Sequence, residues 1–572
     1  MAGRNTRILD LNGRTMIPGI IESHQHIYGA SLRWLDRFGY QSPAREISVQ
    51  AELDLERTQG VLRDAIQEAV AQMDPGQWLM VDLTDHPAAP RQGFIWGATR
   101  RLTNRQALDQ WSPDNPVLVR PGNRGSVNSK ALEAINEFLP GYSASIQETM
   151  HGEDIGEDIA DIGWVGSVEM GVITWELFLE QLPPATLAQG LKVISEEFAS
   201  LGVTTFSSRI QFPKIMTGYA TLAGMGQMPI RFSAHYEIHR MPTDPEQTRQ
   251  IYRRTGVLQG LGDDYFWIDG VASERWDSNY PESCLGPDVP APPHIKSREV
   301  CPKPGDLPWD TLENAMKAGW RLAGVHICGS ESARSFLKMI DRAREVNGWT
   351  IQQVHDMHMT GEHCDVIGQQ PDILEGLKKY GIILSCGADY LRYAPGFVAD
   401  YGPAVEPFIL PFKTYIESGV KLVGQHYGAG SLRRGGEGSG SGFQPPFFQQ
   451  WLAITRNHEG TVWQPEERID RVHAMKMFTS WAAEYVTKPD ELGSLEVGKF
   501  ADLLVIDRDY FTIPVDDILK IRPLMTMVGG KMIVLQESLA KDFGIQVVGP
   551  AYDFKDEEVA HLGKPRRSAG DN

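Results

Sequence analysis

Short apolar segments recur along the chain, and most of them end in a glycine or a polar residue. Buried parallel strands have this pattern, because both faces of such a strand are covered. Apolar residues at helical spacing lie between several segments, as in 186–202, 332–348 and 370–381. This alternation predicts an α/β fold, a (β/α)8 TIM-type barrel. The predicted barrel strands are 16–26, 203–209, 230–236, 265–270, 321–328, 357–363, 381–387 and 420–426.

The stretch between the first two predicted strands is too long to be a loop. It contains strand-like segments at 78–83 and 115–120, so we expect a large insertion subdomain at about 30–185, after strand 1. Another irregular stretch, 427–446, is rich in glycine and serine, a composition that disfavours regular structure. It is either a surface linker or a cover for an active site.

The end of the chain predicts a small C-terminal β layer beside the barrel. Residues 493–511 have the pattern of turn, strand and turn, and 524–535 that of a β-hairpin around Gly529 and Gly530. Four regions are therefore expected. They are an N-terminal part of the β layer at 1–15, the barrel at 16–486, the C-terminal β layer at 487–540 and an extension that fades into a tail at 541–572.

The composition is that of a globular protein with an acidic surface. A formal charge of −19 and a pI near 5.3 disfavour binding to nucleic acid or to an anionic membrane. No apolar run of about 18 residues occurs, so no membrane span is expected. The five cysteines are far apart and odd in number. Together with a polar N-terminus, they predict unpaired thiols in a reducing compartment, the cytoplasm.

Histidines gather at the carboxyl ends of the predicted strands. His24 and His26 end the first strand, and a spacing of two residues points both side chains to one face. His326, His363 and His426 end the fifth, sixth and eighth strands. These ends meet at one face of a barrel, the face that holds active sites. Such convergence exceeds what 15 histidines in 572 residues would give by chance.

Clustered neutral imidazoles favour a divalent metal, Zn²⁺ above all, although such sites also accept Fe, Mn or Ni. Bound zinc lowers the pKa of a water toward ~7 and so provides a nucleophile. An isolated His-x-His pair is a weak motif, and His235 alone is typical of a hydrogen-bonded core residue. Cys328 and Cys364 follow candidate ligands and are either further ligands or small buried hydrophobic residues.

Longer motifs resemble the amidohydrolase superfamily, in particular its amidohydrolase-family-3 branch, which includes N-substituted formamide deformylases. The first-strand signature is GRTMIPGIIESHQHIYG, at 13–29. The resemblance covers nearly the whole chain, in order and at suitable spacing. It extends to the fifth-strand motif at 324–341, the sixth-strand motif at 359–385, the insertion motif at 115–135 and the C-terminal segment at 478–509.

The resemblance implies that His24, His26, His326 and His363 are metal ligands. It also implies hydrolysis of an amide, cyclic amide or related C–N bond by a metal-activated water. In this branch an eighth-strand Asp normally accepts the proton of that water and later returns it to the leaving nitrogen.

The chain departs from the family pattern at three positions. His426 stands where the family has the eighth-strand Asp, and it is a candidate base or ligand. Tyr265 stands where the branch often has a carboxylated Lys that bridges two metals, so one ion is favoured over two. Asn123 replaces a His of the insertion motif. Tyr265 and Asn123 are then candidate substrate contacts.

Charged residues beyond the strand ends could complete the site. Asp389 or Glu274 could supply the missing carboxylate, although a turn role also suits Asp389. Arg275 could bind an acidic substrate or be a solvated loop charge. The main hypothesis is a hydrolase with a small-molecule substrate. The alternatives are a lyase, decarboxylase or C–C hydrolase on the same scaffold, and a catalytically silent relative.

A short N-terminus bears on assembly. The branch usually has more β structure before the first barrel strand than this chain provides. The C-terminal strands would then lack some partners and expose sheet edges, so a homo-oligomer that covers them is one expectation and a truncated start is the other.

Overall fold

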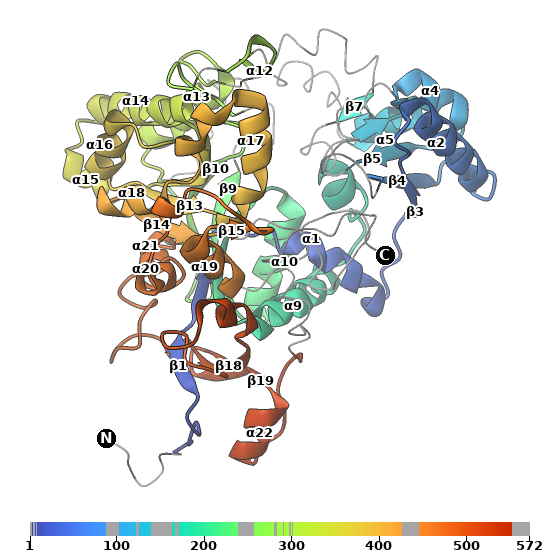
Figure 1. Cartoon of the computed structure of the whole chain (residues 1–572). Helices are drawn as coiled ribbons and strands as arrows, with labels where there is room; N and C mark the ends of the chain where they lie inside the picture. Colours follow the sequence, from blue (N-terminus) through green and yellow to red (C-terminus); the bar gives the residue numbers. More distant parts are fainter. Residues whose placement is uncertain are drawn as a thin grey trace.

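The fold is described from a computed structural model of the chain (Figure 1). It describes residues 3, 6, 8–86, 102–121, 125–138, 163–165, 171–237, 257–278, 283–289, 291–296, 299, 301–425 and 446–551.

An eight-stranded parallel sheet forms the centre of the molecule, in the order β14-β13-β12-β11-β10-β9-β8-β2. The two edge strands meet where the Ser23 amide donates to the carbonyl oxygen of Gly424 at 3.3 Å, which nearly closes the barrel. The predicted (β/α)8 barrel is therefore confirmed. Its strands are β2 (Ile20–Glu22), β8 (Val203–Ile210), β9 (Arg231–Glu237), β10 (Phe266–Ser273), β11 (Leu322–Gly329), β12 (Thr360–Val366), β13 (Ile383–Cys386) and β14 (Lys421–Gly424).

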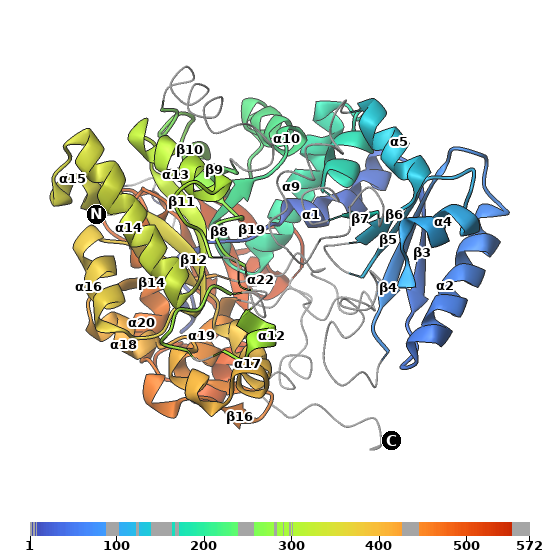
Figure 2. The same cartoon turned by 90° about the horizontal axis from the view of Figure 1, so that it is seen from above.

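Helices cover the outside of the barrel (Figure 2). In α14 (Ser330–Asn347) the buried residues include Phe336 and Ile340, four positions apart and thus on one face, and the helix ends at Gly348 in the left-handed conformation. The other helices around the barrel are α9 (Pro184–Ser200), α10 (Pro213–Gly224), α12 (Pro293–Lys296), α13 (Leu307–Lys317), α15 (Ile351–His355), α16 (Pro371–Tyr380), α17 (Ala394–Tyr401), α18 (Phe412–Glu417), α19 (Pro446–Thr455), α20 (Arg471–Lys476) and α21 (Ser480–Tyr485).

The insertion between β2 and β8 forms a subdomain beside the barrel (Figure 2). Its sheet has the order β3-β4-β5-β6-β7, and a core of its own joins residues such as Leu62, Leu79 and Leu108. The strands are β3 (Ala44–Gln50), β4 (Trp78–Thr84), β5 (Val117–Arg120), β6 (Gly125–Val127) and β7 (Trp164–Val165), and the helices are α1 (Tyr28–Ser31), α2 (Leu55–Val70), α4 (Arg105–Trp111) and α5 (Ser129–Phe138).

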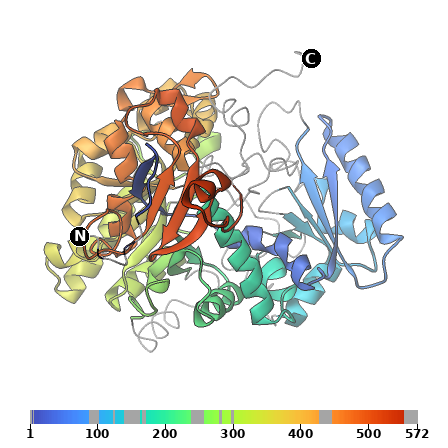
Figure 3. The same ribbon diagram turned by 90° about the horizontal axis from the view of Figure 1, so that it is seen from below.

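A four-stranded antiparallel sheet lies against the end of the barrel at which the strands begin (Figure 3). Its order is β1-β17-β18-β19, formed by β1 (Thr15–Pro18), β17 (Leu503–Ile506), β18 (Pro523–Val528) and β19 (Lys531–Leu535). β1 thus belongs to this sheet, and the first barrel strand begins at Ile20 rather than at residue 16. The chain then continues into α22 (Glu537–Phe543).

Two disulfide bonds join Cys284 to Cys301 and Cys364 to Cys386. The expectation of unpaired thiols was wrong, because folding brings together cysteines that are 17 and 22 residues apart in sequence. The prediction of a reducing compartment loses this support. Within the part of the chain that the structure describes, no helix is long and apolar enough to span a bilayer.

Candidate metal centre at the carboxyl end of the barrel

Four histidines from three strand ends gather inside the carboxyl end of the barrel. His24 and His26 follow β2, His326 lies in β11 and His363 in β12, and all four are buried. The ring centroids of His24 and His26 lie 4.7 Å apart, and those of His24 and His363 lie 5.1 Å apart. The Nε2 atoms of His326 and His363 face each other at 2.6 Å. The structure thus brings these predicted residues together.

A break in strand alternation brings Glu362 and His363 to the same place. Neighbouring residues of a strand normally point to opposite faces. His363 has a φ of +79° and Cys364 one of +49°, and the pairing of β11 with β12 shifts register nearby. Consequently Glu362 contacts His24, while His363 contacts His326.

Each of the four imidazoles is held through its Nδ1 atom. Metal-binding histidines in proteins are commonly held in this way, with one nitrogen anchored and the other offered to the ion. The partners come from separate parts of the chain. His24 Nδ1 lies 2.8 Å from Glu362 Oε1, His26 Nδ1 lies 2.7 Å from the Tyr28 hydroxyl, His326 Nδ1 lies 3.1 Å from the Asp277 carbonyl oxygen, and His363 Nδ1 lies 2.5 Å from the Tyr390 hydroxyl.

Burial also selects the protonation state that a metal requires. It is the largest cause that lowers the pKa of His24, and it lowers the pKa of His26 and of His363 well below the usual value. The pKa of His326 falls to about 3. Neutral imidazoles with a nitrogen lone pair are the ligand form of histidine. The donor set therefore fits a divalent cation.

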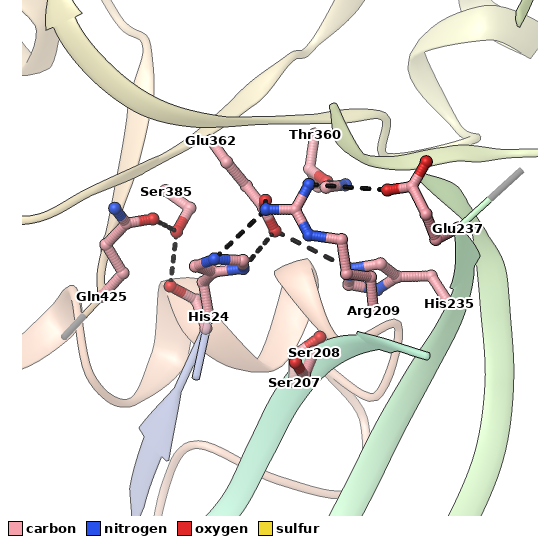
Figure 4. Close-up of polar contacts among 12 residues, drawn as sticks. His24, Ser207, Ser208, Arg209, His235, Glu237, Thr360, Glu362, Ser385 and Gln425 are labelled. Carbon is pink, nitrogen blue, oxygen red and sulfur yellow. Dashed lines mark hydrogen bonds and ion pairs between the residues drawn. The ribbon is translucent and has the colours of Figure 1, made fainter. Parts of the chain in front are cut away.

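Glu362 and Arg209, which were not among the predicted site residues, are the central charges of the site (Figure 4). Arg209 Nη2 lies 3.0 Å from Glu362 Oε2 and 3.3 Å from His24 Nε2. Burial raises the pKa of Glu362, but the contacts with His24 and Arg209 outweigh it and hold the pKa well below its usual range. One signal was present in the sequence, namely charged residues within otherwise apolar strand segments.

A metal-ligand role is also open to Glu362, because one ligand atom from each of His24, Glu362 and His363 lies within 4.8 Å of the others. Both oxygens of Glu362 already have donors, however. Oε1 faces His24 and accepts from the Tyr485 hydroxyl at 3.2 Å, and Oε2 faces Arg209. We therefore interpret Glu362 as the residue that orients His24.

His235 belongs to a second buried network behind this cluster. Its Nδ1 lies 3.2 Å from Asp269 Oδ1, and its Nε2 lies 3.7 Å from Glu362 Oε1. Burial lowers the pKa of His235, but the two carboxylates outweigh it, so the pKa is raised. Arg321 in turn lies 3.3 Å from Asp269 Oδ2. His235 is thus a hydrogen-bonded interior residue, as the sequence indicated.

The carboxylates considered at the strand ends have different surroundings. Asp389 is buried and accepts from Arg392 Nη1 at 2.8 Å, and its neighbour Tyr390 contacts His363. Glu274 follows β10, is half-buried, and its charge raises the pKa of both His26 and His326.

The remaining predicted site residues are more scattered. Arg275 also follows β10, at the same end as the histidines. Tyr265 precedes β10, so it lies at the opposite end of the barrel, where its ring packs under the Arg231 guanidinium at 4.6 Å. The interpretation of Tyr265 as a substrate contact fails because that position begins the strand rather than ending it. Asn123 and His426 lie outside the described residues.

Of the two cysteines beside candidate ligands, one is in a disulfide bond and the other is a buried thiol. Cys364 is bonded to Cys386. Cys328 is buried, and burial raises the pKa of its thiol well above the usual value, which keeps it protonated.

Comparison with known proteins agrees with this architecture. The sequence profile of the Amidohydrolase family matches residues 7–534. The chain is 22% identical to the N-substituted formamide deformylase of Arthrobacter pascens and 21% identical to the protein YtcJ of Bacillus subtilis (strain 168), with 92% of this chain and 90% of each relative covered.

Solved structures share the fold. An uncharacterized metal-dependent hydrolase from Pyrococcus horikoshii OT3 matches with a TM-score of 0.59 at 18% identity, covering 89% of both chains. Its counterpart from Pyrococcus furiosus matches with a TM-score of 0.56, also at 18% identity, covering 88% of this chain and 89% of that one. With the family profile matching most of the sequence, the chain belongs to the amidohydrolase family of hydrolases.

Proposed function

We propose that the protein hydrolyses the C–N bond of a small amide, such as an N-substituted formamide or a cyclic amide, with one divalent ion held by His24, His26, His326 and His363. The observation that carries this proposal is the common anchoring of these imidazoles through Nδ1. A catalytically silent relative has no need to anchor four buried histidines through Nδ1.

Zinc is the ion that we propose for this donor set, because imidazole nitrogens are among its common ligands, although Fe, Mn or Ni also bind imidazole. When bound, a divalent cation polarises a carbonyl group and makes a water acidic enough to react near neutral pH. The protein residues fix the orientation of the ligands. Glu362 holds His24, and Tyr390 holds His363.

A proton must also travel from the attacking water to the leaving nitrogen. Glu274 is the best placed of the described candidates, because it is half-buried and its charge acts on His26 and His326. Asp389 is a second candidate, and its carboxylate is paired with Arg392 at 2.8 Å. His426 remains a third candidate. Asn123 and Arg275 are proposed substrate contacts.

The choice of bond has support from the relatives. The deformylase from Arthrobacter pascens is named for its action on N-substituted formamides, and it aligns with 92% of this chain. This likeness, at 22% identity, supports the proposed class of substrate.

The test is a substrate panel with metal-controlled enzyme. Purified protein, stripped with a chelator and reconstituted with Zn²⁺, would be assayed with N-substituted formamides, N-acyl compounds and cyclic amides, with amine release as the readout. We expect turnover that is lost on stripping and restored by metal. Metal-loaded protein that releases CO₂ or a carbonyl fragment instead would contradict hydrolysis and support the lyase alternative.

Two substitutions sharpen this test. Glu274→Gln should lower kcat by orders of magnitude at unchanged metal content if Glu274 carries the proton. Asp389→Asn is the matched control, since it removes the other described carboxylate. A reversed result would assign the proton transfer to Asp389.

A further inference from the structure

A buried arginine stands within the histidine cluster. Arg209 lies near the end of β8 and is fully buried. In Figure 4 its guanidinium group reaches across the barrel interior between His24 and Glu362 on one side and Glu237 on the other. The Nη1 atom lies 3.8 Å from Glu237 Oε2, and Nη2 lies 3.0 Å from Glu362 Oε2.

The Arg209 guanidinium contacts Glu362 and His24, which are groups that could bind a second metal ion. Two-metal sites hold their ions about 3.5–4 Å apart, and a carboxylate is one group that can lie between two such cations. Glu362 is placed among the histidines where it could serve that role. Arg209 pairs with that carboxylate. It also lies 3.3 Å from His24 Nε2, the ring nitrogen that Glu362 leaves for a ligand.

The positive charge of Arg209 also disfavours a second metal ion. An arginine side chain keeps its positive charge at any ordinary pH. Inside the barrel, where water does not screen it, a fixed cation beside Glu362 and Glu237 offsets the negative potential that would attract a further divalent ion.

We infer that Arg209 takes the place of a second metal ion and so limits the centre to one divalent cation. The inference builds on the proposed function, because it presupposes that the histidines bind a metal. It assigns to Arg209 a role in metal stoichiometry rather than in contact with the substrate.

Metal stoichiometry tests this directly. Apo protein would be titrated with Co²⁺, with bound metal measured by elemental analysis after desalting and the ligand environment followed by the visible absorption of Co²⁺. The wild-type chain should saturate at one equivalent. Arg209→Gln should rise to two equivalents, because the Glu362 carboxylate loses its ion pair with Arg209 and becomes available to a second ion. In the double variant Arg209→Gln, Glu362→Gln the stoichiometry should return to one.

Two further variants act as controls. Arg209→Lys keeps the positive charge and should remain at one equivalent. Arg231→Gln removes a buried arginine from the opposite end of the barrel and should also remain at one. Circular dichroism would verify the fold of each variant.

The outcomes separate the two ideas. A wild-type chain that binds no metal contradicts the proposed function. If the wild type and folded Arg209→Gln each bind one equivalent of metal, the inference is overturned but the proposed function is not. Two equivalents of metal in the wild type have the same consequence. If Arg209→Gln does not fold, the inference is tested with the wild type and Arg209→Lys. A second equivalent of bound metal in either protein contradicts the inference.

Discussion

The two ends of the barrel each contain a buried arginine, in contrasting surroundings. At the amino end, Arg231 donates to both oxygens of Asp502, at 2.7 and 2.9 Å, and to the Asp264 carbonyl. At the carboxyl end, Arg209 is shared between Glu362, Glu237 and the ring of His24, with the Glu237 contact as long as 3.8 Å.

The contrast indicates that the arginine at the amino end serves stability and that the arginine at the carboxyl end serves function. A bidentate arginine–carboxylate pair is specific in geometry, and here it ties β9 to the loop before β17. The carboxyl end instead contains a cluster of neutral imidazoles, and its buried charges each contact more than one partner. Substitutions at the amino end should therefore change stability, and those at the carboxyl end should change metal binding.

The largest effect is expected for His363→Asn. Removal of one imidazole from the centre should weaken metal binding by more than about 100-fold, because the loss of a residue that merely orients a ligand already costs about 10- to 100-fold. Competition with a chromophoric chelator measures this affinity. Unchanged affinity in a folded variant would exclude His363 as a ligand.

Glu362→Gln should have the next largest effect on the metal. The amide keeps the shape but removes the charge that orients His24, so metal affinity should fall by about 10- to 100-fold. The same chelator competition applies. An effect below about twofold would mean that His24 needs no carboxylate or that it is not a ligand.

Asp502→Asn is the matched change at the amino end. It leaves the Arg231 guanidinium buried without its counter-charge, which typically costs about 3–5 kcal/mol. Chemical denaturation should show this loss of stability, while metal stoichiometry and affinity remain unchanged. A large loss of metal binding here would break the comparison between the two ends.

Acid should destabilise the metal-free protein between pH 7 and pH 5. His24, His26, His326 and His363 all have a lowered pKa when folded. In that range the unfolded chain binds more protons than the folded chain, so the free energy of unfolding falls as pH falls. His235 has a raised pKa and opposes this trend as a single group. Thermal midpoints of apo protein across this range would check the sign, and a rise on acidification would contradict it.

The smallest effect is expected for Tyr265→Phe. The residue lies at the amino end, and the substitution keeps the ring beneath Arg231. Stability should change by no more than about 0.5 kcal/mol, and kcat/KM should stay the same. A marked change in KM would restore the sequence-based interpretation of Tyr265 as a substrate contact.

The sequence was sufficient to predict the fold and the histidine cluster. All eight predicted barrel strands overlap observed ones, because buried parallel strands are short apolar runs that can be read locally. His24 follows β2, and His326 and His363 lie within β11 and β12. They were found because the apolar runs that predict these strands also place the histidines toward their carboxyl ends.

Other features depend on tertiary structure. The positive φ of His363, which brings Glu362 into the site, leaves no mark on apolar periodicity. Arg209 is covered only because the barrel closes around it. The pairing of Cys364 with Cys386 likewise depends on the register of β12 with β13, which places His363 opposite Cys386.

The central claim is that neutral imidazoles from three strands share one divalent ion at the carboxyl end of the barrel. Anomalous diffraction from crystals of zinc-loaded protein, recorded on both sides of the zinc absorption edge, tests it most directly. One anomalous peak is expected within about 2.0–2.1 Å of imidazole nitrogens from this cluster of four. A peak that touches none of His24, His26, His326 and His363, or no peak at all in loaded crystals, would contradict it.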